Sequence, residues 1–421
     1  MKVLLINTSE RMGGAAIAAS RLLRALRADG IDAGLLVRDK QTEDKAVVPL
    51  RGRGRQMWNF LWERFVIWLH NGRKRSELFA VSLADTGNDV TKLPIFRAAD
   101  VIHLHWVNQG MLSLPNISRI LASGKHVVWT MHDMWPFTGI CHYAGACTRY
   151  QNECGDCPYL HGSASEDLST TVFRRKQRLY ETARITFVAP SRWLAAEARK
   201  STLLKDFPIE VIPNPIDTTI FRPQPLQKNA LRAAMGWPEK KKLILFGAAK
   251  VSDERKGVNY FVQACHLLNT FYPETAATVA VVAVGKHADA LKDRLPFSVY
   301  IPGYVRNEQQ MANIYAAVDL YVTPSLEDNL PNTVMEAMAC GLPCVGFQIG
   351  GIPELIDHLQ NGYLARYRDA EDLATGIHRM LNPATYEALS RCAVQKVNDH
   401  YAEKIIATRY ENLYHRLIQP Q

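Results

Sequence analysis

Residues Val322 to Phe347, VTPSLEDNLPNTVMEAMACGLPCVGF, place a strand, an acidic turn, a helix and a second strand in one short run. The β-branched and aromatic residues of Leu320 to Val322 predict the first strand. Pro331 favours the first turn of a helix, and Gly341 suits the left-handed position that ends one. The apolar run after this glycine predicts the next buried strand. This order of elements is typical of a parallel α/β sheet.

Two acids frame the predicted helix: Asp328 precedes it and Glu336 lies inside it, with seven residues between them. Each acid has an ordinary structural interpretation. An acid before a helix is often a cap or a partner of the helix dipole, and a helical Glu is usually solvated. The same arrangement also suits a pocket for a sugar nucleotide, so these residues alone leave both interpretations open.

Buried-type strands alternate with helical stretches along the chain, which predicts parallel α/β sheets. The pattern restarts after VIPNPIDTTIFRPQPLQ, residues 211–227, whose four prolines indicate a linker. We therefore expect an N-terminal domain, residues 1–214, and a C-terminal domain, residues 215–399. The predicted strands are Val3 to Asn7, Val101 to His105, Val127 to Met131, Thr186 to Ala189 and Glu210 to Ile212 in the first half, and Leu243 to Phe246, Thr278 to Val284, Val299 to Ile301, Leu320 to Val322 and Pro343 to Val345 in the second.

Composition and charge narrow the class of protein without choosing a function. The chain has 421 residues, of which 47% are hydrophobic and 22% charged, as in ordinary globular proteins. MKVLLINTSE has too short an apolar run for a signal peptide, and no later stretch is long enough to span a membrane. We therefore expect a cytoplasmic protein. A net charge of +9 admits nucleotide diphosphates, phospholipid head groups or nucleic acid as partners.

The motifs PS, an acid, NLPN, MEAMACG and GGIPELI, ending at Ile356, resemble the C-terminal motif of the family 4 glycosyltransferases. The similarity covers nearly the whole chain. It implies an α/β protein of the GT-B fold, with two Rossmann-like domains facing a central cleft and a last helix, about residues 400–421, that packs back on the first domain. It also implies that Asp328 or its neighbour Glu327 holds the donor sugar, that Glu336 binds the donor ribose, and that Asn329 and Leu330 belong to the donor site.

A basic loop follows the first strand of the second half, in LFGAAKVSDERKGVNYF. Lys250 and Lys256 lie on the predicted turn before a helix, where two cations and the helix amino end suit a diphosphate. A solvated basic loop is the alternative. In the resembling family an Arg and a Lys bind the donor diphosphate at these two positions, which carries that role to Lys250 and Lys256, with Arg255 as a further cation.

A second turn of this kind follows the first strand of the chain, in SERMGGAA. A pair of glycines there allows the backbone to approach a ligand, although a tight turn alone explains them equally well. The resemblance to the family's GGA loop implies that Gly13 and Gly14 approach the donor phosphate and the acceptor.

Histidines follow two strands of the first half. TMHDMWPFTG delivers His132 to the carboxyl edge of the sheet, where open α/β domains bind ligands. A lone histidine is more often structural, but the resemblance implies that His132 lies beside the transferred sugar. His103 and His105 share one face of a strand. Without a third ligand we interpret them as packing or acceptor contacts rather than as a metal site.

Four of the eight cysteines lie together in CHYAGACTRYQNECGDCP. In a cytosolic chain such a set favours a closed structural zinc site over disulfides; reduced, unbridged thiols are the alternative, and a disulfide stays possible for the C-x-x-C pair. This arrangement after HD, W and TG is similar to the exopolysaccharide branch of the family, including colanic-acid-type transferases. The predicted zinc ligands are Cys141, Cys147, Cys154 and Cys157.

Residues Arg51 to Glu77 combine aromatic and aliphatic residues at helical spacing with flanking and interleaved basic residues. This pattern suits an interfacial helix on an anionic membrane surface. An amphipathic helix packed on the first domain is the alternative, which periodicity does not exclude. The apolar residues are Trp58, Leu61, Trp62, Phe65 and Leu69, and the basic ones are Arg51, Arg53, Arg55, Arg64, Arg73, Lys74 and Arg75.

These observations and the resemblance predict a hexosyltransferase of surface polysaccharide biosynthesis, placed at the inner face of the cytoplasmic membrane. The resemblance implies that it retains the configuration at the anomeric carbon. It would move a hexose from a nucleoside-diphosphate sugar to a saccharide, expected to be lipid-linked. No D-x-D acid pair is placed at the donor site, so no catalytic metal is expected. An epimerase or phosphorylase of the same fold is the alternative reaction. A zinc-containing nucleic-acid-binding protein is the alternative class, but it leaves the Val322 to Phe347 motif unexplained.

Overall fold

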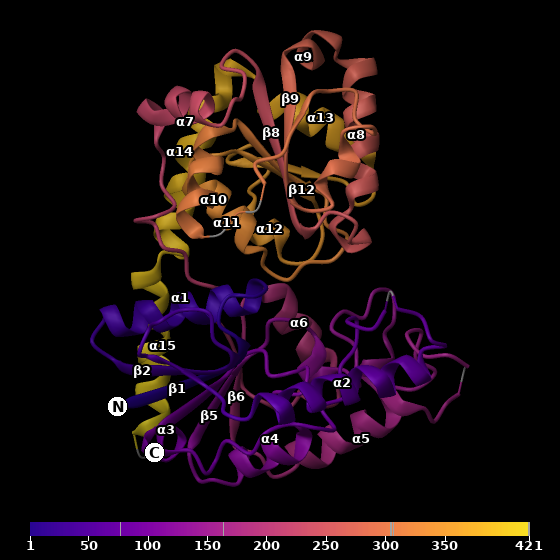
Figure 1. Ribbon diagram of the computed structural model, residues 1–421, viewed down its shortest axis with the longest axis vertical. Helices are drawn as coiled ribbons and strands as arrows, with labels where there is room; N and C mark the ends of the chain where they lie inside the picture. The colour runs from indigo at the N-terminus through magenta and orange to yellow at the C-terminus, as the bar shows by residue number, and fades with distance from the viewer. Residues whose placement is uncertain (76, 163, 304, 306, 420–421) are drawn as a thin grey trace. The chain divides into compact units, whose positions relative to one another are not determined.

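A computed structural model of the chain describes residues 1–75, 77–162, 164–303, 305 and 307–419. The chain divides into two units, one formed by Met1–Pro213 with Ile406–Gln421 and the other by Asn214–Ile405. Figure 1 shows that each unit has one β-sheet with helices on both faces.

The described part of the first unit contains a seven-stranded parallel sheet in the order β3-β2-β1-β4-β5-β6-β7. Alternate residues of β1 (Lys2–Ser9) enter two different cores, because successive side chains point to opposite faces of a sheet. Val3 and Leu5 pack in one core, and Leu4 and Ile6 in the other. The strands are β1 (Lys2–Ser9), β2 (Asp32–Asp39), β3 (Val47–Pro49), β4 (Val101–Leu104), β5 (His126–Thr130), β6 (Ile185–Ala189) and β7 (Ile209–Val211).

The second unit repeats this plan with a six-stranded parallel sheet among its described residues, in the order β10-β9-β8-β11-β12-β13. In both sheets the strand order reverses next to the first strand of the unit, between β1 and β4 and between β8 and β11. Ligands of open α/β sheets bind at the carboxyl ends of the strands at such a reversal. The strands are β8 (Lys242–Lys250), β9 (Val279–Lys286), β10 (Val299–Tyr300), β11 (Leu320–Thr323), β12 (Cys344–Phe347) and β13 (Gly362–Ala365).

Helices lie between most consecutive strands, as parallel sheets require. Those of the first unit are α1 (Gly14–Ala28), α2 (Arg53–His70), α3 (Pro94–Ala98), α4 (Leu114–Leu121), α5 (Leu168–Tyr180) and α6 (Arg192–Lys200). Those that follow are α7 (Lys228–Ala234), α8 (Val258–Phe271), α9 (Pro273–Thr278), α10 (Glu308–Ala317), α11 (Asn332–Ala339), α12 (Ile352–Leu355), α13 (Ala370–Met380), α14 (Pro383–His400) and α15 (Glu403–Ile418).

The predicted α/β class with two Rossmann-like domains is confirmed, and each of the ten predicted strands corresponds to a strand. The prediction omitted β2, β3 and β13. Strand β2 has an acid at each end, β3 is a three-residue edge strand that ends in proline, and β13 is short and starts with glycine. The local sequence signal of each strand is therefore weak. One placement was wrong: Lys250 is the last residue of β8 and does not lie on the following turn, because a register shift after Gly247 lets the strand continue.

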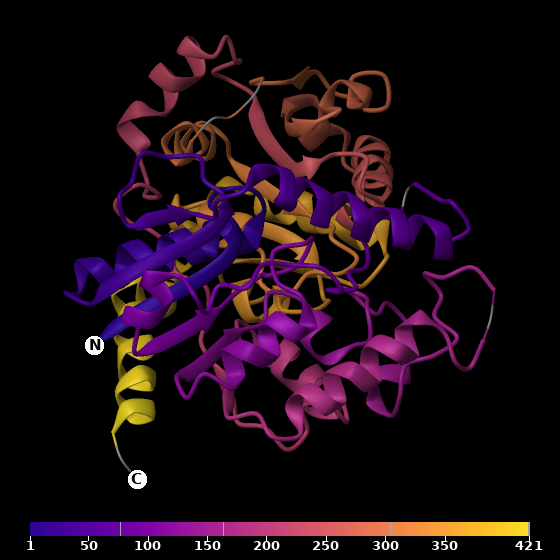
Figure 2. The same ribbon diagram turned by 60° about the horizontal axis from the view of Figure 1, so that its bottom comes forward.

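The last helix of the chain, α15, packs on the sheet of the first unit. The Tyr414 hydroxyl lies 2.7 Å from Nδ1 of His103, and the Tyr410 hydroxyl lies 2.9 Å from Oγ1 of Thr130. In both ribbon views the yellow C-terminal helix runs beside the indigo strands (Figure 1 and Figure 2). Residues far apart in the sequence therefore complete one core.

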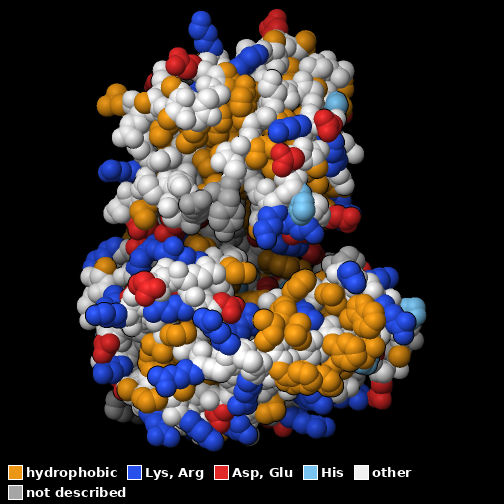
Figure 3. Space-filling view, in the orientation of Figure 1, with side chains coloured by type: hydrophobic (Ala, Val, Ile, Leu, Met, Phe, Trp, Pro, Cys, Tyr) orange, Lys and Arg blue, Asp and Glu red, His pale blue; other side chains and the backbone are white. Residues whose placement is uncertain are grey.

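Helix α2 has a reversed pattern of burial. It buries Gln56, Asn59, Glu63 and Arg64 together with Ile67, whereas its large apolar side chains are exposed. Figure 3 shows apolar side chains gathered over this helix. As the alternative predicted, α2 packs on the first unit, but it does so through its polar side and Ile67 and leaves most of its apolar stripe exposed. The exposed side chains, with their exposed fractions, are Met57 (57%), Trp58 (63%), Leu61 (53%), Trp62 (40%), Phe65 (48%) and Leu69 (46%).

Charge surrounds this apolar face. Six of the seven predicted basic residues are exposed, but Arg64 is buried, with its guanidinium 3.0 Å from the Glu63 carboxylate. Ser76, inside the predicted segment, lies outside the described residues. Among the described helices, none combines the length and apolar character needed to cross a bilayer.

Candidate active site

Two turns of the second unit meet at the strand-order reversal, and glycines make the close approach possible. At Gly257, where φ is +70°, a Cβ atom would lie 1.8 Å from the Pro324 carbonyl oxygen. At Gly350, where φ is +59°, a Cβ atom would lie 1.9 Å from the Asp328 carbonyl oxygen. No side chain fits at either place. The loop after β8 and the GG turn after β12 are therefore both packed on the acidic turn after β11.

This packing brings two predicted donor residues together. Nζ of Lys256, in a 3-10 turn (Glu254–Lys256), lies 2.5 Å from Oδ2 of Asp328. Burial alone would raise the pKa of Asp328, but the charges of Lys256 and Arg255 outweigh burial and hold that pKa below its ordinary value. Asp328 is therefore an ionised, buried carboxylate next to a cation.

Arg255 supports the backbone of the same turn. Its guanidinium donates a hydrogen bond of 2.8 Å to the Glu327 carbonyl oxygen and lies 3.6 Å from the Asp253 carboxylate. The sequence left open whether Asp328 or Glu327 is the acid of the donor site. In the structure the carboxylate of Asp328 contacts Lys256, whereas Glu327 contacts Arg255 through its backbone carbonyl.

The third acid lies on the helix that follows the turn. Glu336 of α11 is buried, and its Oε2 accepts a hydrogen bond of 3.1 Å from the Tyr315 hydroxyl. Burial and the charge of Glu336 raise the pKa of Tyr315, which keeps the phenol protonated as a donor. The sequence prediction missed Tyr315, since no motif marks α10. Asn329 and Leu330 are buried in the turn before α11, and Lys250 is exposed at the end of β8, opposite Lys286 of β9.

In the first unit, the predicted glycine turn begins α1. Gly13 has φ of +92° and a Cβ atom there would meet nothing within 4 Å. Gly14 is the first residue of the helix. The turn follows β1, which lies at the strand-order reversal, and its backbone borders open space.

Three histidines stack at the ends of β4 and β5. The ring centroids of His103 and His105 are 4.2 Å apart and those of His105 and His132 are 5.3 Å apart. Nδ1 of His105 lies 3.0 Å from Nε2 of His132. Burial lowers the pKa of His132 to about 4 and that of His103 to about 3, so both rings are neutral at physiological pH. The sequence predicted that these histidines lie at strand ends, but it did not predict the contact between His105 and His132.

The residue after His132 anchors a second network. Oδ2 of Asp133 lies 2.7 Å from Nδ1 of His142 and accepts a hydrogen bond of 2.8 Å from Nε1 of Trp106. Nε2 of His142 lies 3.0 Å from Oγ of Ser82. This network ties the loop that carries the cysteines to the strand end that carries His132.

The four clustered cysteines line one small cavity of about 20 Å³. All four are free thiols. The Gly139 amide donates to Sγ of Cys154 at 3.2 Å. Within the part of the chain that the structure describes, however, no three His, Cys, Asp or Glu side chains are arranged to hold a metal ion. The zinc site stays a prediction.

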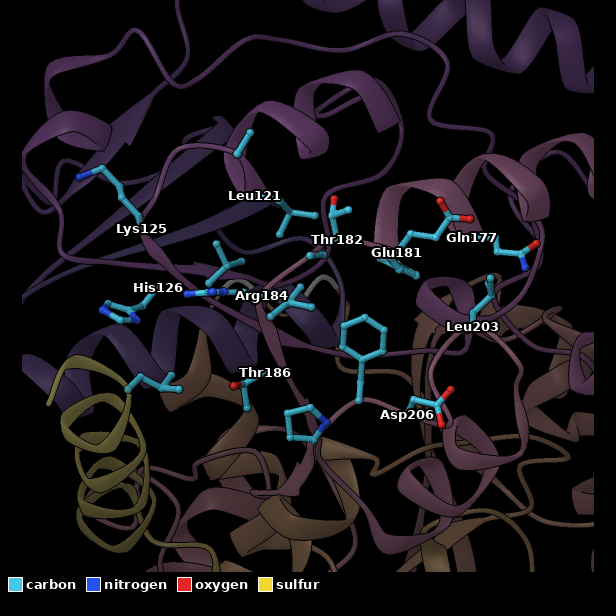
Figure 4. Close-up of a pocket in the computed structure, with 18 of the residues that line it drawn as sticks. Leu121, Lys125, His126, Gln177, Glu181, Thr182, Arg184, Thr186, Leu203 and Asp206 are labelled. Atoms are coloured by element: carbon cyan, nitrogen blue, oxygen red, sulfur yellow. The ribbon is translucent and has the colours of Figure 1, made fainter. Parts of the chain in front are cut away.

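A larger cavity lies elsewhere in the first unit. It has a volume of about 1000 Å³ and is lined by residues such as Lys125, His126, Arg184 and Asp206 (Figure 4). His126 begins β5 and Ile185, also in its lining, begins β6. The cavity is therefore at the amino ends of the strands, the opposite edge from the one where such sheets bind their ligands.

Comparison with known protein families and sequences identifies glycosyltransferases as relatives of this chain. The model for Glycosyltransferase Family 4 matches residues 12–220, and the model for Glycosyl transferases group 1 matches residues 240–383. An uncharacterized glycosyltransferase of Methanocaldococcus jannaschii is 24% identical over 343 residues, which cover 77% of this chain and 85% of that protein. A putative teichuronic acid biosynthesis glycosyltransferase of Bacillus subtilis, TuaC, is 26% identical over 279 residues, 64% of this chain and 68% of that one.

Among solved structures, Anabaena HepE in complex with UDP-glucose superposes with a TM-score of 0.65 at 15% identity, over 99% of this chain and 100% of the other. This similarity shows the GT-B fold, and the two family models show that the chain is a glycosyltransferase. The chain belongs to the family 4 glycosyltransferases, whose two models together span most of its length.

Proposed function

We propose that the protein is a retaining hexosyltransferase that uses a nucleoside-diphosphate sugar. The Lys256–Asp328 pair carries this proposal, because it places a cation and an ionised carboxylate side by side at the strand-order reversal of the second unit. A donor of this class has a diphosphate that needs the cation and sugar hydroxyls that suit the carboxylate.

In this proposal Lys256 and Lys250 stabilise the departing diphosphate, the role that a metal ion has in other enzymes. The bond between the anomeric carbon and the phosphate oxygen breaks, and its electron pair stays on the diphosphate. The acceptor oxygen bonds to the anomeric carbon on the same face, and its proton passes to the diphosphate. Retention follows from attack on the face that the leaving group vacates.

Binding roles are assigned to the other predicted residues. Asp328 accepts hydrogen bonds from sugar hydroxyls and Glu336 from the ribose. Arg255, Asn329 and Leu330 shape the donor turn, and Gly13 and Gly14 let the backbone approach the donor phosphate and the acceptor. His132 lines the transferred sugar. The support is positional: these residues lie on turns that follow strands at the carboxyl edge of each sheet, except Glu336, which lies on the helix after the turn.

The acceptor is proposed to be a lipid-linked saccharide. An open groove of about 940 Å³ at the carboxyl ends of β2 and β3 is lined by Met57 of α2, by two acids, Asp39 and Glu43, and by four basic residues, Arg38, Lys40, Arg51 and Arg53. Basic residues suit the phosphate of a lipid carrier, and the exposed apolar face of α2 continues from the groove. We propose that this face docks on an anionic membrane surface, on the cytoplasmic side, where the basic residues meet acidic lipid head groups.

Surface polysaccharide synthesis is the proposed process. The name of the Bacillus relative refers to teichuronic acid biosynthesis, and the cysteine-containing loop resembles the exopolysaccharide branch of the family.

A structural zinc ion at Cys141, Cys147, Cys154 and Cys157 completes the proposal. Beyond the shared cavity, the support is the buried cation Lys176, whose Nζ donates hydrogen bonds of 2.5 and 3.0 Å to the carbonyl oxygens of Trp135 and Thr138. Burial lowers the pKa of Lys176 to about 7, and Cys154 and Cys141 act against that shift. A site with four thiolates would carry a net negative charge that this cation balances in part. Closed sites of this type are structural.

A donor screen tests the proposed function. The protein is mixed with a panel of nucleoside-diphosphate sugars, and the true donor should raise the melting temperature by mass action. With acceptor, that donor should yield a glycoside whose anomeric configuration, measured by NMR, matches the donor's. Isomerisation of the donor without an acceptor would instead show an epimerase. A requirement for inorganic phosphate would show a phosphorylase.

A further inference from the structure

The contact between His105 and His132 is determined by the sheet. His105 follows β4, His132 follows β5, and these strands are parallel neighbours in register. The backbone of His105 is held on two sides, because its amide donates to the Ile6 carbonyl at 2.9 Å and its carbonyl accepts from Nε1 of Trp129 at 3.0 Å. The ring of His105 therefore has a defined place from which Nδ1 reaches Nε2 of His132 at 3.0 Å.

The free nitrogen of His105 determines where the protons lie. Nε2 of His105 is buried and has no hydrogen-bond partner among the described residues. A buried N–H without a partner is rare in proteins, and a bare ring nitrogen is the less costly state. The proton of neutral His105 is therefore on Nδ1, which donates to Nε2 of His132. A neutral His132 that accepts at Nε2 must carry its own proton on Nδ1.

His103 lies beside this pair, but its two ring nitrogens contact other residues. Its ring is tilted by 34° against that of His105, and its nitrogens contact the Tyr414 hydroxyl at 2.7 Å and Oγ1 of Thr130 at 2.8 Å. Tyr414 belongs to α15, so a helix from the end of the chain fixes the ring behind His105.

We propose that His105 is a positioning residue that holds His132 in one ring orientation and in the Nδ1-protonated tautomer. This inference rests on the proposed function, in which His132 lines the transferred sugar. A ring held in one tautomer presents the substrate with one fixed pattern of donor and acceptor. Orientation supplied before binding lowers the activation barrier without altering how tightly the donor is held.

The test combines NMR with two substitutions. In wild-type protein, ¹⁵N spectra of the histidine rings should show His132 protonated at Nδ1. His105→Asn keeps an amide donor near the place of Nδ1, so the tautomer should persist and kcat should stay near the wild-type value. His105→Leu removes the donor. His132 should then exchange between tautomers, and kcat should fall about threefold to tenfold, as for the loss of one hydrogen bond, while the donor KM changes little.

Controls separate positioning from folding. His103→Leu should lower the melting temperature but leave the His132 tautomer and kcat unchanged. In a His132→Ala background, His105→Leu should have no further effect on kcat, because the two residues act through one contact.

Two results would overturn the inference: a wild-type spectrum with His132 protonated at Nε2, or unchanged kcat and tautomer in folded His105→Leu protein. Full activity of His132→Ala would instead refute the proposed role of His132 at the sugar. The NMR result on its tautomer would still stand, so the two failures are distinguishable.

Discussion

Nζ of Lys256 lies 2.5 Å from Oδ2 of Asp328, although the two residues are 72 positions apart. The pair joins the loop after β8 to the turn after β11, two adjacent strands at the reversal of the sheet order. Before a donor binds, the Lys256 ammonium and the buried Asp328 carboxylate neutralise each other. A bound diphosphate would share Lys256 with Asp328, which leaves the carboxylate available to sugar hydroxyls.

Lys256→Met should destabilise the protein in a pH-dependent way. The pKa of Asp328 is lower in the folded protein than in the unfolded chain, so its pairing stabilises the fold above the unfolded pKa and is lost as pH falls through the folded pKa. Removing one partner of a buried ion pair lowers the free energy of unfolding by up to about 3–5 kcal/mol. We expect a loss of about 1–3 kcal/mol for this variant, because Lys256 is partly exposed. Denaturation at pH 7 and pH 3 should show a difference in the free energy of unfolding between variant and wild type that is larger at pH 7 than at pH 3. An equal difference at both pH values would contradict the pairing.

Transfer should depend on Lys256 and Glu336. Lys256→Ala and Glu336→Ala each remove a charged hydrogen bond to the donor, which corresponds to about 1.5–3 kcal/mol and at least a tenfold loss in kcat/KM. Asp328→Glu tests the acid position. Unchanged or higher activity would place Asp328 in the site, and loss of transfer in Glu327→Ala alone would move the site by one residue. Near-normal transfer by Lys256→Ala would remove that residue from the site.

Tyr315→Phe should weaken donor binding without unfolding the protein. The substitution removes only the hydroxyl that donates to Glu336, so the donor KM should rise about threefold to tenfold, the value of one hydrogen bond. Tyr363→Phe is a matched control, since it removes a hydroxyl that donates to Asp372 in the same unit. Equal KM changes in the two variants would show a general effect on the unit instead of an effect on Glu336.

Helix α2 should bind anionic vesicles. Each basic residue near an acidic surface contributes about 1 kcal/mol, so binding should weaken as salt rises. Replacing Trp58, Trp62 and Phe65 by Ser should abolish co-sedimentation with vesicles that contain phosphatidylglycerol. Phe271→Ser, which changes an exposed aromatic residue of the second unit, is the control and should leave binding intact. A wild-type protein that does not bind these vesicles would contradict the docking proposal.

The cysteine cavity should hold about one zinc ion per chain. Burial raises the pKa of Cys157 to about 11 and that of Cys154 to about 12, so zinc must displace their protons and its affinity should fall at lower pH. Cys154→Ser and Lys176→Met should both lower the zinc content measured by elemental analysis. Cys392→Ser, at an exposed cysteine, should not. Zinc-free protein with four reactive thiols in this loop and full activity would refute the site, and a bond between Cys154 and Cys157 would replace it by a disulfide.

The local sequence was enough to predict the parallel sheets, because apolar strands and glycine turns are local signals, and the motifs around Asp328 and Glu336 indicated the family by resemblance. It also placed Asp328, Glu336, Lys256 and His132 at strand ends or on the following helix. These are local properties of short segments.

Contacts between distant segments were decided only by the tertiary structure. Neither the pairing of Lys256 with Asp328 nor the hydrogen bond from Tyr315 to Glu336 has a local signal, because the strand order of the sheet brings these residues together. Helical spacing predicted that α2 is amphipathic, but only its packing shows which face is buried. Periodicity defines a stripe on a helix, whereas the buried pair of Glu63 with Arg64 shows that the polar side faces the core and the apolar side faces outward.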